Sequence, residues 1–160
     1  MIQSVAFIGL GAMGYRMAAH LPQHFDHVYV WNRNFAKAQQ HATDYGTTAV
    51  SLDEAVQADL IFSCLPTSQD VMDLIAQVNI KSGAICVDCT SGVPEAAQQL
   101  QQQLAKQQVA YLDAPVSGQT IGAENASLTF MVGGDVNAFE HALPAMQSLG
   151  KLIKHVGDSG

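Results

Sequence analysis

The chain has 160 residues, 48% of them hydrophobic and 13% charged, with a formal net charge of −7. This composition is that of one folded domain and excludes an intrinsically disordered chain. The acidic balance argues against nucleic-acid and anionic-membrane partners. No apolar run reaches the ~20 residues of a membrane span, and no secretory signal precedes the first strand, so a cytoplasmic location is expected.

Short apolar runs alternate with helix-forming stretches along most of the chain. Strands are predicted at residues 4–8, 28–31, 47–49, 60–64, 84–87 and 109–112, and helices at 12–21, 35–45, 51–56, 68–77 and 94–106. After a stretch rich in Pro, Ser and Gly, a strand is predicted at 128–133, a helix at 136–148 and a final strand at 151–155. Strands that are apolar on both faces and joined by helices predict an α/β fold. We expect a Rossmann-type, doubly wound, mainly parallel sheet with helices on both faces.

The most informative motif follows the first predicted strand. It reads G-x-G-x-x-G and comprises Gly9, Leu10, Gly11, Ala12, Met13 and Gly14. The first glycine allows a tight turn, the second leaves room for a pyrophosphate, and the third lets the next helix approach the strand. The N-terminus of that helix offers free N–H groups to phosphate, so the motif predicts a dinucleotide site. A plain glycine turn is the alternative interpretation.

The end of the second strand distinguishes NADP from NAD. An acidic residue there binds the ribose 2′-hydroxyl of NAD and repels the extra phosphate of NADP. Asn32 stands where that acid is expected, Arg33 and Asn34 follow it, and Lys37 lies one turn into the next helix. Because a planar guanidinium binds phosphate in a bidentate manner, this segment favours NADP, with NAD as the second choice. A solvated loop arginine is the alternative.

The cysteines and histidines predict no metal site. Cys86 and Cys89 form a C-x-x-C pair, but residues i and i+3 of a strand point to opposite faces, so buried, unreactive thiols are expected. His20 and His24 have helical i, i+4 spacing without a third ligand nearby, which favours surface histidines. His27 and His41 are expected to be solvated.

Four motifs together resemble the β-hydroxyacid dehydrogenase family. Residues 7–18 resemble its G-L-G-x-M-G-x-x-M-A opening, and residues 88–94 resemble its D-x-S-T-x-x-P segment. The resemblance implies a hydroxyl near the nicotinamide ribose at Ser91, with Thr90 beside it as a further cofactor residue. A third motif is similar to a family loop that lies beside the cofactor, and it consists of Cys64, Leu65 and Pro66.

The fourth motif, residues 113–134, resembles the family's substrate-binding segment D-A-P-V-S-G-G-x-x-G-A-x-x-G-x-L-T-x-M-V-G-G. The resemblance implies that Ser117, Gly118 and Gln119 bind the substrate carboxylate. Two residues depart from the pattern, because Gln119 and Ala126 stand where the family has glycine. These departures leave the identity of the substrate open.

The resemblance spans the entire chain and implies a NAD(P)-binding Rossmann domain over residues 1–160. It implies an oxidoreductase of the EC 1.1.1 type that transfers a hydride between NADP(H) and a short 3-hydroxyacid or its semialdehyde. Examples in the family are 3-hydroxyisobutyrate dehydrogenase and tartronate semialdehyde reductase.

The family's catalytic lysine and helical second domain follow this segment. No catalytic residue is therefore expected within this chain. The lysine is expected beyond Gly160, and the chain alone is expected to lack turnover. The absent helical domain is expected to form a homodimer or tetramer. The alternative function is a non-catalytic NAD(P)-binding sensor or partner module.

Overall fold

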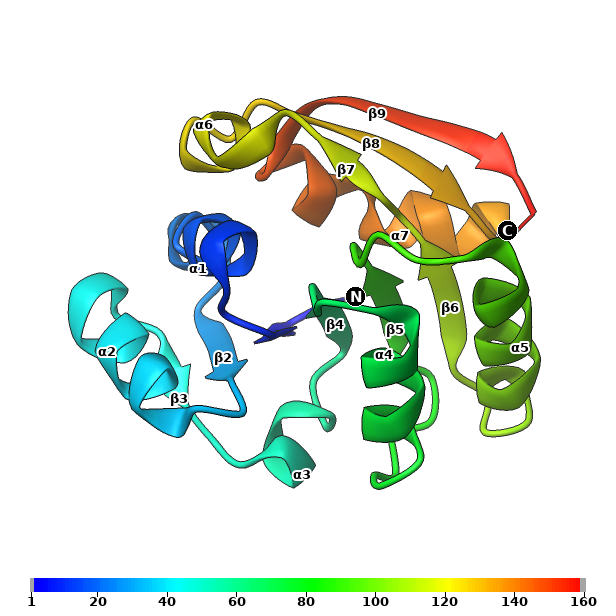
Figure 1. Ribbon diagram of the computed structural model, residues 1–160, viewed down its shortest axis with the longest axis horizontal. Helices are drawn as coiled ribbons and strands as arrows, with labels where there is room; N and C mark the ends of the chain where they lie inside the picture. The colour runs from blue at the N-terminus through cyan, green and yellow to red at the C-terminus, as the bar shows by residue number, and fades with distance from the viewer. Residues whose placement is uncertain (1, 159–160) are drawn as a thin grey trace.

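The computed structural model describes residues 2–158, and these residues form a nine-stranded sheet (Figure 1). The first six strands run parallel in the order β3-β2-β1-β4-β5-β6. They are β1 (Ser4–Ile8), β2 (His27–Trp31), β3 (Thr48–Ala49), β4 (Leu60–Ser63), β5 (Ile85–Asp88) and β6 (Ala110–Asp113). The predicted fold class, an α/β Rossmann-type domain with a mainly parallel sheet, is confirmed.

The sheet changes direction after β6. Strand β8 (Leu128–Gly133) runs antiparallel to β6 and to β7 (Val116–Ser117), and β9 (Gly150–Gly157) pairs parallel with β8. In Figure 1 strands β7, β8 and β9 lie together along the upper edge of the molecule. The sheet is therefore parallel where the dinucleotide motif lies and mixed where the segment that resembles the substrate-binding motif lies.

Helices cover both faces of the sheet. Helices α1 (Ala12–Ala18), α2 (Phe35–Tyr45), α6 (Gln119–Glu124) and α7 (Val136–Gln147) contribute to one core, and α3 (Leu52–Ala55), α4 (Ser68–Ile75) and α5 (Pro94–Ala105) to the other. Strand β1 shows the alternation, because Val5 and Phe7 enter the first core whereas Ala6 and Ile8 enter the second. A strand buried on both faces reads as a continuous apolar run, which is why the sequence predicted it.

The order of the strands creates a switch point beside β1. From β1 the chain proceeds outward to β2 and β3, then crosses to the other side of β1 and proceeds through β4, β5 and β6. In sheets of this kind the loops at the carboxyl ends of the strands diverge at the switch point and leave a crevice between them. The loops that follow β1, β2 and β4 therefore define the place to look for a site.

Two elements were not predicted from the sequence, namely β7 and α6. The predicted first helix is also shorter than expected, since α1 ends at Ala18 and a 3₁₀ turn, η1 (Leu21–Gln23), follows with Pro22 inside it. Proline fixes its own backbone angle and lacks an N–H, so it interrupts the α-helical hydrogen bonds.

His41 is fully buried, so the expectation that it is solvated is wrong. Its Nδ1 lies 2.8 Å from Oγ1 of Thr47, and its Nε2 lies 2.9 Å from the carbonyl oxygen of Tyr15. A carbonyl oxygen only accepts, so Nε2 carries the proton. Burial lowers the pKa of His41 from its ordinary value of 6.5, which keeps the ring neutral. The histidine thus joins α1, α2 and the residue before β3 from inside the molecule.

The cysteines are free and lie in separate environments, as expected. Cys86 belongs to the core under α3 to α5, whereas Cys89 belongs to the core under α1 and α7. Within residues 2–158 no group of three or more His, Cys, Asp or Glu side chains comes together to hold a metal. No helix in that range has the length and apolar character needed to cross a membrane.

Candidate functional site

The glycine-rich loop joins β1 to α1 at the switch point, and its three glycines occupy different surroundings. Gly9 has φ +97°, and a Cβ on it would collide with the carbonyl oxygen of Cys64. A Cβ on Gly14 would collide with the carbonyl oxygen of Gly9. By contrast, a Cβ on Gly11 would meet nothing within 4 Å. Gly9 and Gly14 thus allow close backbone packing, and Gly11 faces open space of the kind that a diphosphate needs.

Asn32 holds this loop against the end of β2. Its Oδ1 accepts a hydrogen bond of 2.8 Å from the backbone N–H of Leu10, and its Nδ2 donates one of 3.0 Å to the carbonyl oxygen of Asn34. Leu10 itself is fully buried. The amide therefore fixes two loops relative to each other, at the position where an acidic residue would accept ribose hydroxyls.

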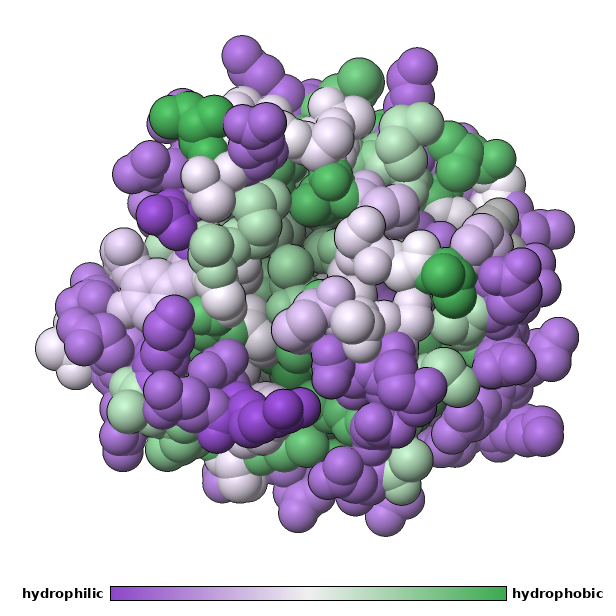
Figure 2. All heavy atoms as spheres, in the orientation of Figure 1, coloured by the Kyte–Doolittle hydropathy of each residue, from purple (hydrophilic) through white to green (hydrophobic). Residues whose placement is uncertain are grey.

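A cleft of about 740 Å³ opens between the glycine-rich loop, the end of β2 and helix α4. In Figure 2 the molecule is hollowed near its centre, with apolar residues inside the hollow and polar residues around it. The cleft is lined by Gly9, Gly11, Ala12, Met13, Gly14, Trp31, Asn32, Arg33, Asn34, Leu52, Cys64, Leu65, Pro66, Asp70, Asp73, Leu74 and Gln77. The structure thus brings together eleven of the fifteen predicted cofactor residues in one cavity.

The far wall of the cleft was not predicted from the sequence. Asp70, Asp73, Leu74 and Gln77 lie on or just after α4, and Leu52 begins α3. Asp70, Asp73 and Leu74 of α4 have the spacing i, i+3 and i+4, which places them on one side of the helix, and Gln77 continues this spacing just after it. That spacing, in a helix that directly follows the predicted cofactor loop, was a signal that could have identified this wall.

The loop of Cys64, Leu65 and Pro66 is held by a buried network at the ends of β4, β5 and β6. Oγ1 of Thr90 accepts a hydrogen bond of 3.0 Å from the backbone N–H of Leu65. Asp88 then accepts from the backbone N–H of Thr90 at 3.0 Å. Thr90 is only 3% exposed, whereas its neighbour Ser91 is exposed. Thr90 therefore acts on the loop, and neither it nor Ser91 lines the cleft.

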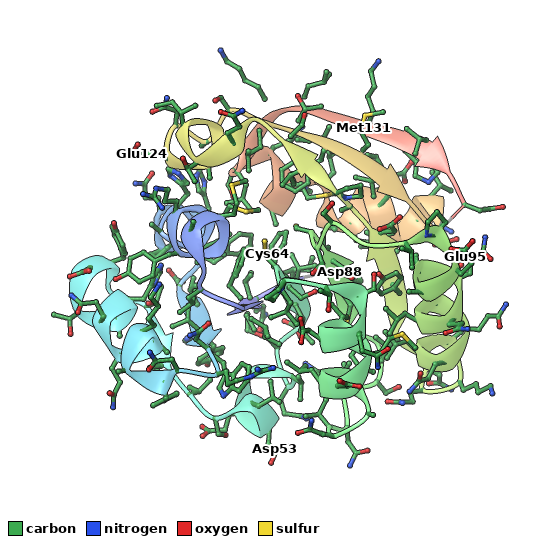
Figure 3. All side chains as sticks on the ribbon, in the orientation of Figure 1. Asp53, Cys64, Asp88, Glu95, Glu124 and Met131 are labelled. Atoms are coloured by element: carbon green, nitrogen blue, oxygen red, sulfur yellow. The ribbon has the colours of Figure 1, made fainter. Side chains whose placement is uncertain are left out.

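Asp88 is the centre of this network, and Figure 3 shows it near Cys64 in the middle of the molecule. Besides Thr90, its carboxylate accepts from the hydroxyls of Ser63 at 3.0 Å and Tyr111 at 2.7 Å. Burial and the adjacent carboxylate raise the pKa of Tyr111 well above its ordinary value. The phenol therefore remains a neutral donor, and a buried carboxylate with several donors is a stable arrangement.

Cys64 lines the cleft without being reactive. Burial and the charge of Asp88 raise the pKa of its thiol to about 11. The thiolate is the nucleophilic form of cysteine, so at neutral pH this side chain contributes only its shape and apolar character.

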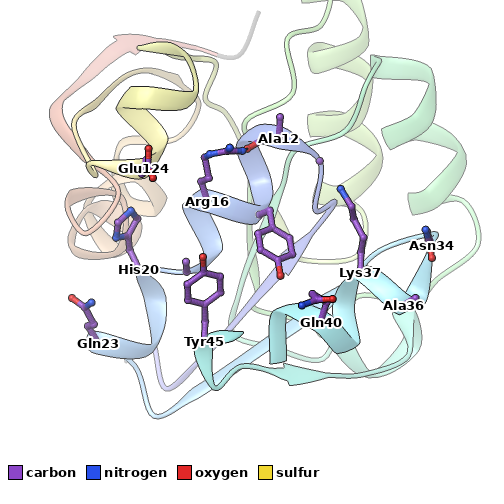
Figure 4. Close-up of a pocket in the computed structure, with 13 residues that line it drawn as sticks. Ala12, Arg16, His20, Gln23, Asn34, Ala36, Lys37, Gln40, Tyr45 and Glu124 are labelled. Atoms are coloured by element: carbon purple, nitrogen blue, oxygen red, sulfur yellow. The ribbon is translucent and has the colours of Figure 1, made fainter. Parts of the chain in front are cut away.

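Two exposed cations flank the glycine-rich loop from opposite sides. Nη2 of Arg33 lies 3.7 Å from Oδ1 of Asp70 at the edge of the cleft. Nζ of Lys37 lies 3.5 Å from the carbonyl oxygen of Leu10, in a neighbouring groove of about 760 Å³. Figure 4 shows Lys37 extending from α2 toward the start of α1. The groove lined by Lys37 and the cleft lined by Arg33 thus adjoin at Gly11, which lines both.

The predicted substrate residues lie outside both cavities. Ser117 ends β7, Gly118 precedes α6 with φ +134°, and Gln119 begins α6 with φ +59°, and all three are exposed. Ala126 has φ +54°. Both residues that replace a glycine of the family pattern therefore keep the left-handed backbone that glycine adopts most easily. The shape of the segment is retained, and two side chains are added to it.

Helix α6 packs against α1, and a histidine joins the two. Nε2 of His20 lies 2.8 Å from the carbonyl oxygen of Ala123, which is buried in the core. His20 therefore connects the dinucleotide half of the sheet to the segment that carries Ser117.

Comparison with known proteins places this geometry in a family. Residues 4–157 match the family model described as the NAD binding domain of 6-phosphogluconate dehydrogenase. Over 165 residues the chain is 36% identical to the NAD-dependent L-serine dehydrogenase of Pseudomonas aeruginosa, covering 99% of this chain and 55% of that protein.

Solved structures agree with the sequence match. The 3-hydroxyisobutyrate dehydrogenase of Mycobacterium tuberculosis, solved with L-serine, is 31% identical with a TM-score of 0.93, covering 99% of this chain and 56% of that one. Psf3 in complex with NADP⁺ and 2-OPP is 29% identical with a TM-score of 0.88, covering 97% of this chain and 57% of that one. The chain thus spans little more than half the length of the proteins that it matches.

Proposed function

The chain belongs to the β-hydroxyacid dehydrogenase family, and we propose that it forms the NADP(H)-binding part of an oxidoreductase that acts on a short 3-hydroxyacid or its semialdehyde. The observation that carries the proposal is the cleft beside the glycine-rich loop, with open space at Gly11. Its position at the switch point of a doubly wound sheet is the one where dinucleotides bind.

The residues of the cleft fit a dinucleotide. The open side of Gly11 leaves room for the pyrophosphate, and a Cβ at this position would take up part of that room. Leu52, Leu65 and Leu74 provide an apolar wall suited to the flat face of an adenine ring. Pockets for such ligands are mostly apolar with a few placed polar groups, as this one is.

Arg33 and Lys37 support the choice of NADP. Both cations are exposed on either side of the glycine-rich loop, and Asn32 already uses its amide to hold the two loops together. No carboxylate therefore stands at the end of β2 to accept ribose hydroxyls or to repel a 2′-phosphate. Among the relatives, the L-serine dehydrogenase is named as NAD-dependent and Psf3 was solved with NADP⁺.

The relatives and the β7–α6 segment support the proposed substrate class. L-serine and 3-hydroxyisobutyrate, which appear in the names of two relatives, both carry a hydroxyl on the carbon β to a carboxylate. We propose that Ser117 and the backbone N–H groups at Gly118 and Gln119 hold such a carboxylate, because exposed N–H groups in a glycine turn form an anion-binding nest.

In the proposed reaction the cofactor and the protein have different roles. The nicotinamide, when bound, supplies the hydride acceptor or donor. The residues of this chain would orient the dinucleotide through the cleft and hold the substrate carboxylate at β7–α6. The proton of the substrate hydroxyl would be handled by a lysine expected beyond Gly160, so we expect this chain to bind without turnover. We propose dimer or tetramer formation through a further, helical domain of the whole protein.

Calorimetric titration of the chain with NADPH and NADH tests the proposal. We expect NADPH to bind more tightly, and we expect Arg33→Gln and Lys37→Gln each to weaken NADPH by about tenfold with little effect on NADH, because a charge-assisted contact is worth about 1.5 kcal/mol or more. Lys106→Gln removes an exposed cation that lines neither cavity and is the matched control. Binding of neither dinucleotide would contradict the proposal, and equal binding would contradict the choice of NADP.

A further inference from the structure

Arg33 is paired across the edge of the cleft with a carboxylate that the family pattern does not explain. Arg33 belongs to the loop after β2, whereas Asp70 lies in the first turn of α4, and both line the cleft. Their side chains approach to 3.7 Å, with Arg33 87% exposed and Asp70 28% exposed. The contact therefore spans the opening between two separate parts of the wall.

The two partners differ in how firmly they are held. Oδ2 of Asp70 accepts hydrogen bonds from the backbone N–H of Thr67 at 3.1 Å and from its hydroxyl at 2.9 Å. In return, Oγ1 of Thr67 accepts from the backbone N–H of Asp70, which completes a capping box. These contacts fix the carboxylate and leave Oδ1 directed to Arg33. Arg33 has an exposed guanidinium with several donors, so it is the partner that can be shared or drawn away.

We propose that Asp70 is a specificity-determining residue that lowers the affinity of the cleft for NADPH relative to NADH, an inference that rests on the proposed function. A 2′-phosphate placed at Arg33 must compete with Oδ1 of Asp70 for the guanidinium. A dinucleotide that carries only hydroxyls on this ribose does not meet this cost. Asp70 therefore weakens binding of the phosphorylated cofactor and leaves binding of the other unchanged.

The size of the effect follows from the geometry. The pair is exposed to solvent on the arginine side, so its interaction is that of a surface ion pair and not of a buried one. The relevant ratio is the dissociation constant of NADH divided by that of NADPH. Removing the charge of Asp70 should raise this ratio by about two- to fivefold. The gain should shrink in high salt, because salt screens charges that face the solvent.

The experiment compares Asp70→Asn with a matched variant in the 160-residue chain. Asparagine keeps an oxygen that can accept from Thr67, so the capping of α4 is preserved while the charge is removed. Asp73→Asn removes the same charge one turn further along the same wall, but Asp73 accepts from Gln69 and is not paired with Arg33. Dissociation constants for NADPH and NADH are measured by calorimetry for each variant, and thermal unfolding checks the fold. If Asp70→Asn does not fold, Asp70→Ser, which also lacks the charge, replaces it in the same measurements of the two dissociation constants.

We expect the ratio to rise in Asp70→Asn, to stay unchanged in Asp73→Asn, and to show no further change when Asp70→Asn is added to Arg33→Gln. Equal weakening of NADPH and NADH binding in Asp70→Asn would overturn the inference, since Asp70 would then contribute to the binding of both dinucleotides alike. A rise in the ratio that persists without Arg33, or that Asp73→Asn reproduces, would overturn it as well. A wild-type chain that binds both dinucleotides while Asp70→Asn leaves the ratio unchanged would overturn this inference alone. A wild-type chain that binds neither would overturn the proposed function.

Discussion

The loops that follow β1, β2 and β4 and the segment of residues 114–127 differ in how they are held. The loops after β1 and β4 are each fixed by a side chain from another part of the chain: Asn32, in the loop after β2, holds Leu10, and Thr90 holds Leu65. The donors and acceptors involved are satisfied inside the protein before any ligand binds. The dinucleotide side of the molecule is therefore preorganised, which lowers the entropic cost of binding.

The second region presents its polar groups outward. Ser117, Gly118 and Gln119 are exposed, and the chain passes through left-handed backbone at Gly118, Gln119 and Ala126. Its anchoring comes from packing, through Ala123 in the core and the contact of His20 with α6. The dinucleotide half of the proposed site is thus held by internal hydrogen bonds, whereas the other half exposes its polar groups to solvent.

The largest effect should come from adding a methyl group to a closely packed glycine in the preorganised half. Gly14→Ala places a methyl group against the carbonyl oxygen of Gly9, and Gly11→Ala places one in open space. We expect Gly14→Ala to lower the free energy of unfolding by roughly 3 kcal/mol, because overpacking forces the backbone to move. Gly11→Ala should leave stability within about 0.5 kcal/mol and weaken dinucleotide binding by about tenfold.

Urea unfolding and calorimetry on the same two variants separate these effects. A Gly11→Ala variant that binds NADPH and NADH as the wild type does would show that no ligand approaches this loop. A stable Gly14→Ala variant would show that α1 can shift away from β1 without cost.

A smaller effect should follow from removing one of the internal hydrogen bonds. Thr90→Val keeps the shape of the side chain and leaves the N–H of Leu65 without its acceptor. We expect a loss of about 1–2 kcal/mol in the free energy of unfolding, the cost of an unsatisfied polar group, and weaker dinucleotide binding. Ser91→Ala, at the exposed neighbour, should change neither quantity, and equal effects of both variants would contradict the role given to Thr90.

The second region should respond to substitution in the opposite direction. Gln119 and Ala126 hold φ +59° and φ +54°, which cost about 1 kcal/mol for residues other than glycine. Gln119→Gly and Ala126→Gly should each raise the free energy of unfolding by up to about 1 kcal/mol. Gln102→Gly, the same change inside α5, should lower it by about 1 kcal/mol. Destabilisation by both left-handed variants would mean that these side chains make contacts that outweigh the backbone strain.

The smallest expected effect concerns pH. The pKa of His41 is lowered by burial, so the unfolded chain binds the proton more readily than the folded one. Its contribution to stability is fully present above pH 6.5 and is lost as the pH falls from 6.5 toward the lowered value in the folded state. Denaturant unfolding at several pH values should show this loss in the wild type and in His27→Gln, whose histidine is exposed, but not in His41→Gln.

The sequence predicted the parallel half well, because its signals are local. Strand β1, the glycine-rich loop and the start of α1 are adjacent in the chain, and α2 begins and ends at the predicted residues. Asn32 was predicted from its place at the end of β2, and the loop of Cys64 from its resemblance to a motif of the family. In each case a short stretch of chain contains the information that fixes its structure.

The remaining features depend on contacts between distant residues. Helix α6 has only six residues, includes Gly122, and is recognisable by its packing on α1 rather than by any periodicity. Thr90 acts on Leu65, which is 25 residues away, and His41 bonds to Tyr15 across 26 residues. A side chain whose partner is set by the tertiary fold cannot be assigned its role from its neighbours in sequence.

The position of the single tryptophan has an optical consequence. Trp31 ends β2 in the wall of the cleft, and its carbonyl oxygen accepts the N–H of Gly9 at 3.0 Å. The indole emission of the whole chain therefore originates beside the glycine-rich loop, and excitation at wavelengths where tyrosine does not absorb observes this loop alone. A change in that emission reports events in the preorganised half, and residues 114–127 contribute no tryptophan signal to obscure it.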